Sequence, residues 1–342
     1  MIAHLYAGGY GDSIQHFLLN TAAPSLRPLR TYPVDRPSWL ALSGRLLWAA
    51  TEREEGGVIS GFSVRKDGAL IPLGALEVPG SALCHLAPMP GGYIAGANYG
   101  AGSLFTVSTA PDGRPDWLTA LIRHSGSGPN PARQEAPHVH SCVMHPDGKR
   151  LFSADMGLDR IFCYGVSPDG GLTPQPEWDV PFPPGAGPRH LVFADGGRTL
   201  FAAAELGNRV FAFREGAQGW TQTDCCALTG DPDSLTAAIR LSADERRLYV
   251  TVRGEDTVTA FAAEVDTGRL TRLATVPSGG HWPRDLILLP DGSGLLTANE
   301  RSGCIALLPL DGEGVPGEAV LTVPCGQVTS LVTVEAEKKS GS

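Results

Sequence analysis

The sequence predicts an all-β chain that folds as a seven-bladed β-propeller, with the ring closed by strands from both termini. Two observations predict this fold. A pattern of polar residue, apolar run, turn and second apolar run recurs along the chain of 342 residues. The 43 glycines and 28 prolines indicate many turns and few long helices. No segment shows helical periodicity of useful length, so each repeat is interpreted as strands alone.

The repeats themselves define the blades. Four copies align without gaps, and each spans 16 positions from its first residue to its last: His140–Met156, Arg189–Glu205, Ala237–Arg253 and Arg284–Glu300. Two weaker copies end at Glu52 and Tyr99. Each copy predicts a β-hairpin, because two short apolar runs flank a turn with Pro, Asp or Gly. Further strand-like runs lie between the copies. Four strands per repeat of about 46 to 57 residues are typical of a propeller blade.

The chain ends predict the seventh blade. The run "VTSLVTVE" at 328–335 reads as one strand without a following partner, and "IAHLYAGGYG" at 2–11 can supply that partner. Joining the two ends removes the open sheet edges of the ring. We therefore expect a single domain over residues 1–335 and a flexible polar tail at 336–342. An open β-solenoid is the alternative, but its repeats would be shorter.

Composition limits the possible partners. The net charge is −9 and no Lys/Arg-rich tract is present, which argues against nucleic acid and anionic membrane surfaces as partners. No apolar run approaches 18 residues, and the N-terminus lacks the pattern of a signal peptide. The seven cysteines are scattered and form no CxxC motif, so a reduced, cytoplasmic protein is expected. A small anionic ligand stays compatible with the acidic chain, and the oligomeric state is left open.

Charged residues flank the hairpins at fixed places. In an antiparallel hairpin the start of the first strand lies beside the end of the second, so both places meet at one mouth of the channel. The first place holds His140, Arg189 and Arg284. The second place holds Glu52, Tyr99, Glu205, Arg253 and Glu300, and the position before it holds Asn98, Asp155 and Asn299.

Two interpretations of these polar residues were compared. Blade-end polar residues often only bridge neighbouring strands, and this structural role is favoured for Asp155 and Asn299, which sit where turns need Asx hydrogen bonds. The arginines at 189, 253 and 284 indicate more, because like charges held together cost free energy unless an anion or carboxylates compensate. Arginine also matches carboxylate and phosphate oxygens in geometry. The sequence therefore predicts a pocket for an anionic metabolite.

Several motifs carry a family resemblance. The segments "HVHSCVMHPDGKRLFSADMGLDRI", "GPRHLVFADGGRTLFAAAELGNRV" and "HWPRDLILLPDGSGLLTANERSG" resemble the lactonase family of seven-bladed propellers, and the likeness covers nearly the whole chain. That family includes 6-phosphogluconolactonases and a carboxymuconate lactonizing enzyme. The resemblance implies four catalytic residues and a set that lines the same cleft. The catalytic four are His140, Arg189, Glu205 and Arg253, and Arg284, Asn98 and His138 are expected to bind substrate. One departure is Glu245, where the blade turn usually carries Gly.

Three functions follow from this reasoning. The resemblance implies hydrolysis of a sugar lactone, with conversion of 6-phosphogluconolactone to 6-phosphogluconate as the default and without a cofactor. Glu205 is assigned as the general base and His140 as the acid that protonates the ring oxygen, although these two roles could be reversed. A cycloisomerase could use the same groups without water attack. A non-catalytic propeller that binds a ligand or protein is the third alternative. No GxSxG motif is present, which argues against a covalent acyl intermediate.

A metal site was also considered. His138 and His140 point the same way on an extended strand, because side chains alternate along it. No carboxylate or cysteine motif accompanies them, so no metal is expected.

Overall fold

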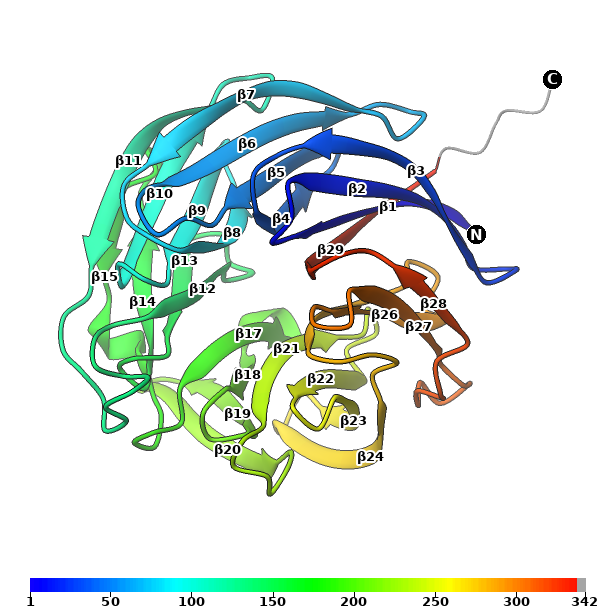
Figure 1. Cartoon of the computed structure of the whole chain (residues 1–342). Helices are drawn as coiled ribbons and strands as arrows, with labels where there is room; N and C mark the ends of the chain where they lie inside the picture. Colours follow the sequence, from blue (N-terminus) through cyan, green and yellow to red (C-terminus); the bar gives the residue numbers. More distant parts are fainter. Residues whose placement is uncertain (337–342) are drawn as a thin grey trace.

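The computed structural model describes residues 1–336 and shows seven antiparallel sheets arranged in a ring around a central channel (Figure 1). Six sheets have four strands, and the sheet of blade 4 carries a fifth, short strand. This confirms the predicted all-β, seven-bladed propeller. Residues 337–342, most of the predicted polar tail, lie outside the described residues. Among the described residues, no helix is long and apolar enough to cross a membrane.

Blades 1 to 3 contain the first part of the chain together with its last strand. Blade 1 consists of β29 (Val328–Glu335), β1 (Ile2–Gly9), β2 (Ser13–Asn20) and β3 (Ser25–Pro33). Blade 2 consists of β4 (Pro37–Ser43), β5 (Leu46–Thr51), β6 (Gly57–Val64) and β7 (Leu70–Val78). Blade 3 consists of β8 (Leu83–Met89), β9 (Tyr93–Asn98), β10 (Ser103–Thr109) and β11 (Pro115–Arg123).

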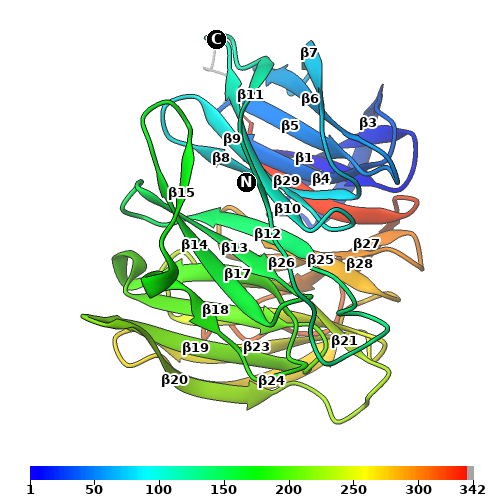
Figure 2. The same ribbon diagram turned by 90° about the vertical axis from the view of Figure 1, so that its left-hand side faces the viewer.

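Blades 4 to 7 follow in chain order, and Figure 2 shows blades 3, 4 and 5 succeeding one another around the ring. Blade 4 consists of β12 (Val139–Met144), β13 (Arg150–Asp155), β14 (Arg160–Val166), β15 (Leu172–Pro174), the 3₁₀ turn η1 (Pro176–Trp178) and β16 (Val180–Pro181). Blade 5 consists of β17 (Pro188–Ala194), η2 (Asp195–Gly197), β18 (Thr199–Ala204), β19 (Arg209–Gly216) and β20 (Gly219–Ala227). Blade 6 consists of β21 (Leu235–Leu241), β22 (Arg247–Arg253), β23 (Thr257–Glu264) and β24 (Arg269–Pro277). Blade 7 consists of β25 (Pro283–Leu288), β26 (Gly294–Asn299), β27 (Cys304–Pro309) and β28 (Leu321–Pro324).

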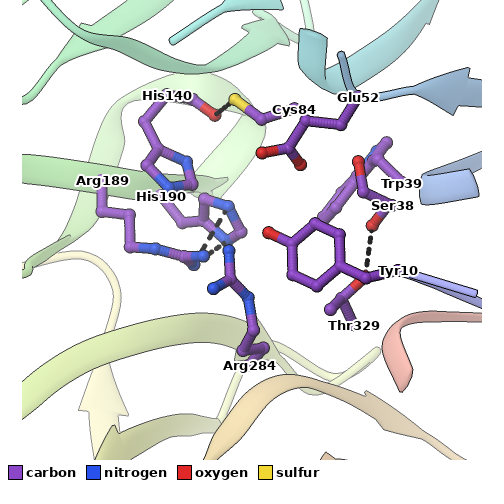
Figure 3. Close-up of a pocket in the computed structure, with 10 residues that line it drawn as sticks. All are labelled: Tyr10, Ser38, Trp39, Glu52, Cys84, His140, Arg189, His190, Arg284 and Thr329. Atoms are coloured by element: carbon purple, nitrogen blue, oxygen red, sulfur yellow. Dashed lines mark hydrogen bonds between the residues drawn. The ribbon is translucent and has the colours of Figure 1, made fainter. Parts of the chain in front are cut away.

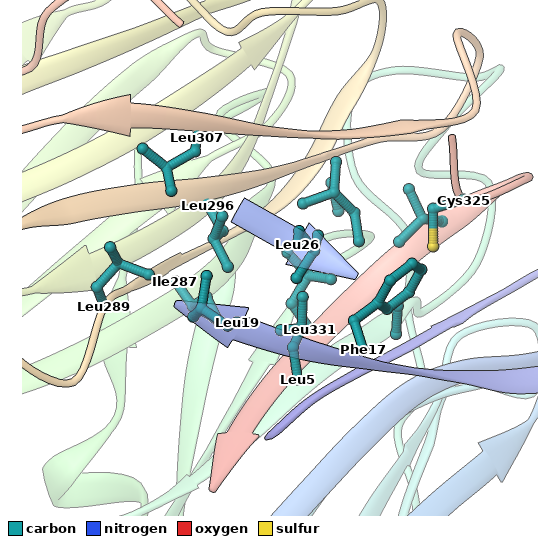
Figure 4. Close-up of a cluster of buried hydrophobic side chains, with 14 of the residues drawn as sticks. Leu5, Phe17, Leu19, Leu26, Ile287, Leu289, Leu296, Leu307, Cys325 and Leu331 are labelled. Carbon is teal, nitrogen blue, oxygen red and sulfur yellow. The ribbon is translucent and has the colours of Figure 1, made fainter. Parts of the chain in front are cut away.

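The ring is closed by the two ends of the chain, as predicted. Strand β29 pairs antiparallel with β1 and is the first strand of blade 1. The side chains of Leu5, Phe17 and Leu331 pack in one cluster with Ile287 and Leu296 of blade 7 (Figure 4). Because these side chains come from both ends of the sequence, burial of apolar surface holds the last blade to the first.

Burial changes from the inside of each blade to its outside. The second strand β18 is buried at every residue, whereas the outer strand β24 is buried only at Leu270 and is otherwise exposed or half-buried. This pattern follows from the stacking of neighbouring sheets, since an inner strand is covered on both faces and an outer strand is partly solvated. The blade interiors are therefore apolar, and polar side chains gather at the ends of the inner strands.

The turn that carries Glu245 adopts the expected glycine geometry. Gly148 and Gly292 occupy the equivalent turns of blades 4 and 7 with φ of 68° and 71°, and Glu245 has φ of 58°. A side chain in this left-handed region is strained. The Glu245 carboxylate accepts a hydrogen bond of 2.8 Å from the backbone N–H of Asp195 in blade 5, which offsets part of that strain. The replacement of the usual Gly by Glu245 therefore affects the contact between blades 5 and 6.

Candidate active site

A β-bulge interrupts the innermost strand of every blade at the same level. The pairing register skips one residue there, and in blade 6 it skips two, Ala237 and Ala238. A bulge leaves a residue outside the ladder and re-aims its side chain. We call the skipped residues the bulge ring: Thr329, Ser38, Cys84, His140, Arg189, Ala237 and Arg284.

A second ring lies at the end of each second strand. The backbone N–H of Glu205 donates to the carbonyl of Gly187, two residues before the bulge residue Arg189, and the same bond recurs in five other blades. In blade 6, Arg253 pairs with Leu235 in the same register. We call these residues the exit ring: Tyr10, Glu52, Tyr99, Met156, Glu205, Arg253 and Glu300. The predicted juxtaposition of the two places is thus confirmed.

The pocket at this mouth is built largely from the two rings. Eight of its ten lining residues belong to them: Tyr10, Ser38, Trp39, Glu52, Cys84, His140, Arg189, His190, Arg284 and Thr329. Figure 3 shows His140, Arg189 and Arg284 facing Ser38 and Tyr10 across the pocket. The bulge ring is asymmetric, because blades 1, 2 and 3 contribute small residues opposite the large cationic ones. This asymmetry leaves the space.

Aromatic rings pack together beside the pocket. Trp39 stacks on His85 with ring centroids 4.3 Å apart and meets the edge of His190 at 5.3 Å. The His190 ring lies 5.4 Å from that of His140. Burial lowers the pKa of His85 to about 3 and that of His190 well below its usual value, with nearby arginines adding to the effect. These histidines are neutral at pH 7, and their rings pack against the neighbouring aromatic side chains.

Glu205 is the centre of the charged cluster. Its Oε1 accepts a hydrogen bond of 2.6 Å from Arg133, and its Oε2 accepts one of 2.6 Å from Arg253. The Nε of Arg189 lies 3.0 Å from the same Oε2. The carboxylate is only 2% exposed. Burial alone would raise its pKa, but the charges of Arg253 and Arg189 outweigh burial and hold the pKa well below its usual value.

Several buried polar atoms at this mouth have no protein partner. They are the Nε atoms of Arg189, Arg253 and Arg284, the Nδ1 of His140 and the Oγ of Ser38. The Arg189 Nε is close to Glu205, yet its N–H does not point along a hydrogen bond. An unsatisfied buried polar group costs about 1–3 kcal/mol. A ligand that accepts hydrogen bonds from arginine would satisfy most of these atoms, which fits an anion.

His140 is neutral in the free protein. Burial and the charge of Arg189 lower its pKa well below the usual 6.5. The role of acid assigned to His140 from the sequence needs a proton that this side chain lacks in the free protein at neutral pH, because it is buried next to cations. Arg189 itself stays cationic at neutral pH, since burial lowers its pKa only to about 9. Arg189 and Arg253 are each at most 4% exposed, so these charges form a buried cluster.

Two predicted site residues lie away from the pocket. Asn98 is fully buried, and its side-chain amide donates to the carbonyl of Pro79 and the hydroxyl of Ser103, both at 3.0 Å. It closes a turn and does not line the pocket. Its neighbour in the sequence, Tyr99, belongs to the exit ring. Adjacent strand residues face opposite ways, so Asn98 and Tyr99 cannot both face the channel.

His138 lies behind Tyr99. The two rings stack with centroids 4.4 Å apart, and Tyr99 meets His140 edge-on at 5.6 Å. The His138 Nε2 is 3.2 Å from Glu135. The bulge at His140 breaks the alternation that would have aligned the two histidines, so they do not converge. Over residues 1–336, no group of three or more His, Cys, Asp or Glu side chains is arranged to hold a metal ion.

Asp155 and Asn299 have the structural roles favoured from the sequence. Asp155 Oδ1 accepts hydrogen bonds from the backbone N–H groups of His138, Gly157 and Leu158. The Asn299 side chain accepts a 3.0 Å hydrogen bond from the Ser278 hydroxyl. Both residues therefore organise turns.

The sequence missed Arg133 and the small members of the bulge ring. Arg133 lies in the long loop between β11 and β12, outside the repeat. The sequence did contain a signal for this loop. Equivalent positions of successive repeats are 57 residues apart from Tyr99 to Met156 but only 48 apart from Glu205 to Arg253, which indicates an insertion in the longer repeat. Ser38, Cys84 and Thr329 gave no signal, since small residues in strands are common.

Comparisons with known proteins agree with this geometry. The family model described as "Lactonase, 7-bladed beta-propeller" matches residues 4–333. The chain belongs to the seven-bladed lactonase family. A 6-phosphogluconolactonase of Bacillus subtilis is 27% identical over 318 residues, 90% of each chain. A 6-phosphogluconolactonase of Formosa agariphila is 28% identical over 317 residues, 89% of this chain and 90% of that one.

A solved structure shares about the same sequence identity with this chain. The periplasmic gluconolactonase of Pseudomonas aeruginosa superposes with a TM-score of 0.93 at 28% identity, covering 98% of this chain and all of that one. The names of these relatives thus include both a phosphorylated and an unphosphorylated sugar lactone as substrate.

Proposed function

We propose that the protein hydrolyses a sugar lactone, with 6-phosphogluconolactone converted to 6-phosphogluconate as the leading case. One observation carries the proposal: a neutral, buried histidine with a free Nδ1 lines a pocket with Arg189 and Arg284, whose buried Nε–H groups have no protein partner. Hydrolysis needs a group that accepts a proton from water and donors for the oxyanion that develops on the carbonyl. The names of the relatives support the same substrate class.

His140 is the base in this proposal. Water attacks the lactone carbonyl carbon, and its proton passes to the free nitrogen of His140. The bond between that carbon and the ring oxygen then breaks, and the proton returns from His140 to the ring oxygen, which leaves as a hydroxyl. The new carboxylic acid ionises and releases one proton to solution. A neutral histidine starts this cycle in the correct protonation state.

Glu205 is better suited to positioning than to proton transfer. Its oxygens are held by Arg133, Arg253 and Arg189, and its pKa is strongly lowered, so it is a weak base. We therefore propose the reverse of the division preferred from the sequence. Arg189 and Arg284 supply donors for the oxyanion and for an anionic substituent, and Glu205 holds Arg189 and Arg253 in place.

The test is acid release in a pH-stat with the purified protein. The panel contains 6-phosphogluconolactone, gluconolactone and a carboxymuconate lactone, and inorganic phosphate is added as a competing anion. We expect acid release from at least one sugar lactone and competitive inhibition by phosphate. Arg189→Gln should remove most of the activity. Arg160→Gln, an exposed arginine on blade 4, is the control and should keep it.

Two outcomes would contradict the proposal. Absence of acid release from both sugar lactones would exclude sugar-lactone hydrolysis and support the ligand-binding alternative, whereas turnover of the carboxymuconate lactone alone would favour the cycloisomerase. Full activity in Arg189→Gln would show that catalysis occurs elsewhere. Loss of turnover in Glu205→Gln is expected under either role of Glu205, so it cannot assign the base.

A further inference from the structure

Three polar side chains line the pocket on the side away from the cationic residues. Tyr10 follows β1 in blade 1, whereas Ser38 in β4 and Glu52 after β5 belong to blade 2. Figure 3 shows the Tyr10 hydroxyl and the Glu52 carboxylate pointing into the space in front of Arg189 and Arg284. The pocket therefore has one wall of cationic groups and, opposite it, a wall of hydroxyl and carboxylate oxygens.

The protein itself does not use the oxygens of this second wall. The Oγ of Ser38 is buried and has no hydrogen-bond partner. In the part of the chain that the structure describes, neither the Glu52 carboxylate nor the Tyr10 hydroxyl makes a hydrogen bond or an ion pair. By contrast, Glu300, which holds the equivalent exit-ring position in blade 7, lies 3.4 Å from Arg284. All three groups are therefore available to a ligand.

The other polar groups on this side of the pocket are already hydrogen-bonded. The Thr329 hydroxyl donates to the carbonyl of Ser38 at 2.7 Å. The indole N–H of Trp39 donates to a carbonyl of β8 at 3.1 Å, and the Cys84 thiol donates to a carbonyl of β12 at 3.4 Å. Recognition of a ligand on this side thus depends on the three unused groups.

The backbone fixes the positions of these three residues. The carbonyl of Arg36 accepts a hydrogen bond of 2.7 Å from the N–H of Ser38 and one of 3.2 Å from the N–H of Glu52. The N–H of Tyr10 donates to the carbonyl of Gln327 at 3.1 Å. A binding wall is effective when its groups are held in place before the ligand arrives. The second wall meets this condition at the level of the backbone.

The chemistry of this wall matches hydroxyl groups. An ionised carboxylate only accepts hydrogen bonds, so Glu52 needs a donor on the ligand. Burial raises the pKa of Tyr10 to about 12, so its hydroxyl keeps its proton at neutral pH and can both donate and accept. A phosphate or carboxylate offers Glu52 no donor, and a cation is repelled by the arginines opposite. Hydroxyl groups both donate and accept, which suits all three residues.

We propose that Tyr10, Ser38 and Glu52 are specificity-determining residues, which bind the hydroxyl groups of a sugar lactone and discriminate against lactones without them. The inference rests on the proposed lactone hydrolysis and adds which residues select the substrate. A lactone without hydroxyl groups leaves the three groups unpaired, and sites built to bind a substrate hydroxyl reject analogues that lack it. Hydrogen bonds on this wall also turn the lactone carbonyl toward His140 on the other.

The first test compares lactones with and without hydroxyl groups. It measures kcat/KM for gluconolactone and for δ-valerolactone, which has the same six-membered ring without hydroxyl groups. Loss of a hydrogen bond to a carboxylate should lower the ratio of the two values about tenfold in Glu52→Gln. Loss of a hydrogen bond between neutral groups should lower it about threefold in Ser38→Ala and in Tyr10→Phe.

Glu54→Gln is the matched control. Glu54 carries the same charge two residues further along the chain, is exposed and does not line the pocket, so the ratio should stay unchanged in this variant. An unchanged ratio in the double variant Glu52→Gln, Ser38→Ala would overturn the inference, even if both kcat/KM values fell, because the residues would then act in folding or catalysis without selecting the substrate. An equal fall of the ratio in Glu54→Gln would overturn it as well.

A second test does not need turnover. Calorimetry compares the binding of gluconate and of 5-hydroxypentanoate, the ring-opened acids of the two lactones, to wild type and the same variants. Gluconate should bind more tightly to wild type, and this advantage should fall about tenfold in Glu52→Gln and persist in Glu54→Gln. If wild type hydrolyses neither lactone but shows this pattern, the proposed reaction fails and the hydroxyl-binding wall stands. If 5-hydroxypentanoate binds to wild type as tightly as gluconate, the inference fails whatever the activity.

Discussion

Glu205 balances the charge of three arginines, so its replacement by Gln should destabilise the fold. Two unit charges about 4 Å apart attract by about 4 kcal/mol at an effective dielectric constant of 20. Glu205 has Arg133 and Arg253 at 2.6 Å and Arg189 at 3.0 Å. Much of this attraction offsets the cost of burying the charges. Removal of one buried partner costs about 3–5 kcal/mol, because the remaining charges stay uncompensated. We expect a loss in this range for Glu205→Gln.

Urea unfolding at pH 7 measures this loss, with Glu300→Gln as the matched control. Glu300 occupies the same exit-ring position in blade 7, but its carboxylate is 14% exposed and makes one contact, 3.4 Å from Arg284. Its replacement should cost less than about 1 kcal/mol. Equal free energies of unfolding for the two variants would refute the reasoning, since the cluster around Glu205 would then contribute no more than a partly exposed pair.

The pH dependence of the loss provides an independent check. The folded-state pKa of Glu205 lies well below the ordinary value of 4.5. The stabilisation from such a carboxylate is fully present above the unfolded-state pKa and fades as the pH falls toward the folded-state pKa. The difference between wild type and Glu205→Gln should therefore be constant from pH 8 to about 5.5 and shrink below about 4.5. A difference that first shrinks near pH 6.5 would point to a histidine instead.

Two further predictions concern ring closure and the base. Leu331→Ala in β29 should lower the free energy of unfolding in urea by about 2–5 kcal/mol, because the side chain is buried and β29 completes the core of blade 1. Leu200→Ala inside blade 5 removes an equally buried side chain and should cost as much. A cost below about 1 kcal/mol for Leu331→Ala would show that the closing strand is not part of the cooperative fold. Because the pKa of His140 is lowered well below 6.5, kcat/KM should stay level between pH 6 and 8, and a decline with a midpoint near 6.5 would exclude neutral His140 as the base.

The sequence alone was sufficient for the blades and for the charged residues of the repeat that meet at the mouth. Arg189 and Glu205 are 16 positions apart in the sequence, and so are Arg284 and Glu300. Equivalent residues therefore fall at equivalent places in their blades. Antiparallel pairing then brings the start of one strand beside the end of the next. Both steps depend only on local chain geometry, which repeats in every blade.

Some features depended on the loop outside the repeat. Arg133 reaches Glu205 from the segment between β11 and β12, and a side chain in such a loop has no register that predicts its contacts. Asn98 was expected in the cleft because of the family resemblance, but the pairing of β8 with β9 buries its amide against Ser103. Which of two adjacent residues faces the channel is decided by that pairing.

The sequence by itself determined the architecture and the charged groups that the repeat carries, because strand periodicity and repeat length are local properties. Only the tertiary structure decided how those groups behave. The bulges turn His140 and Arg189 toward one pocket, and the packing of seven sheets removes water from them. Burial then lowers the pKa of His140, while the surrounding arginines lower that of Glu205. A pKa depends on the charges and the solvent around a group in three dimensions, and for this reason the base proposed from the structure is His140, whereas the sequence favoured Glu205.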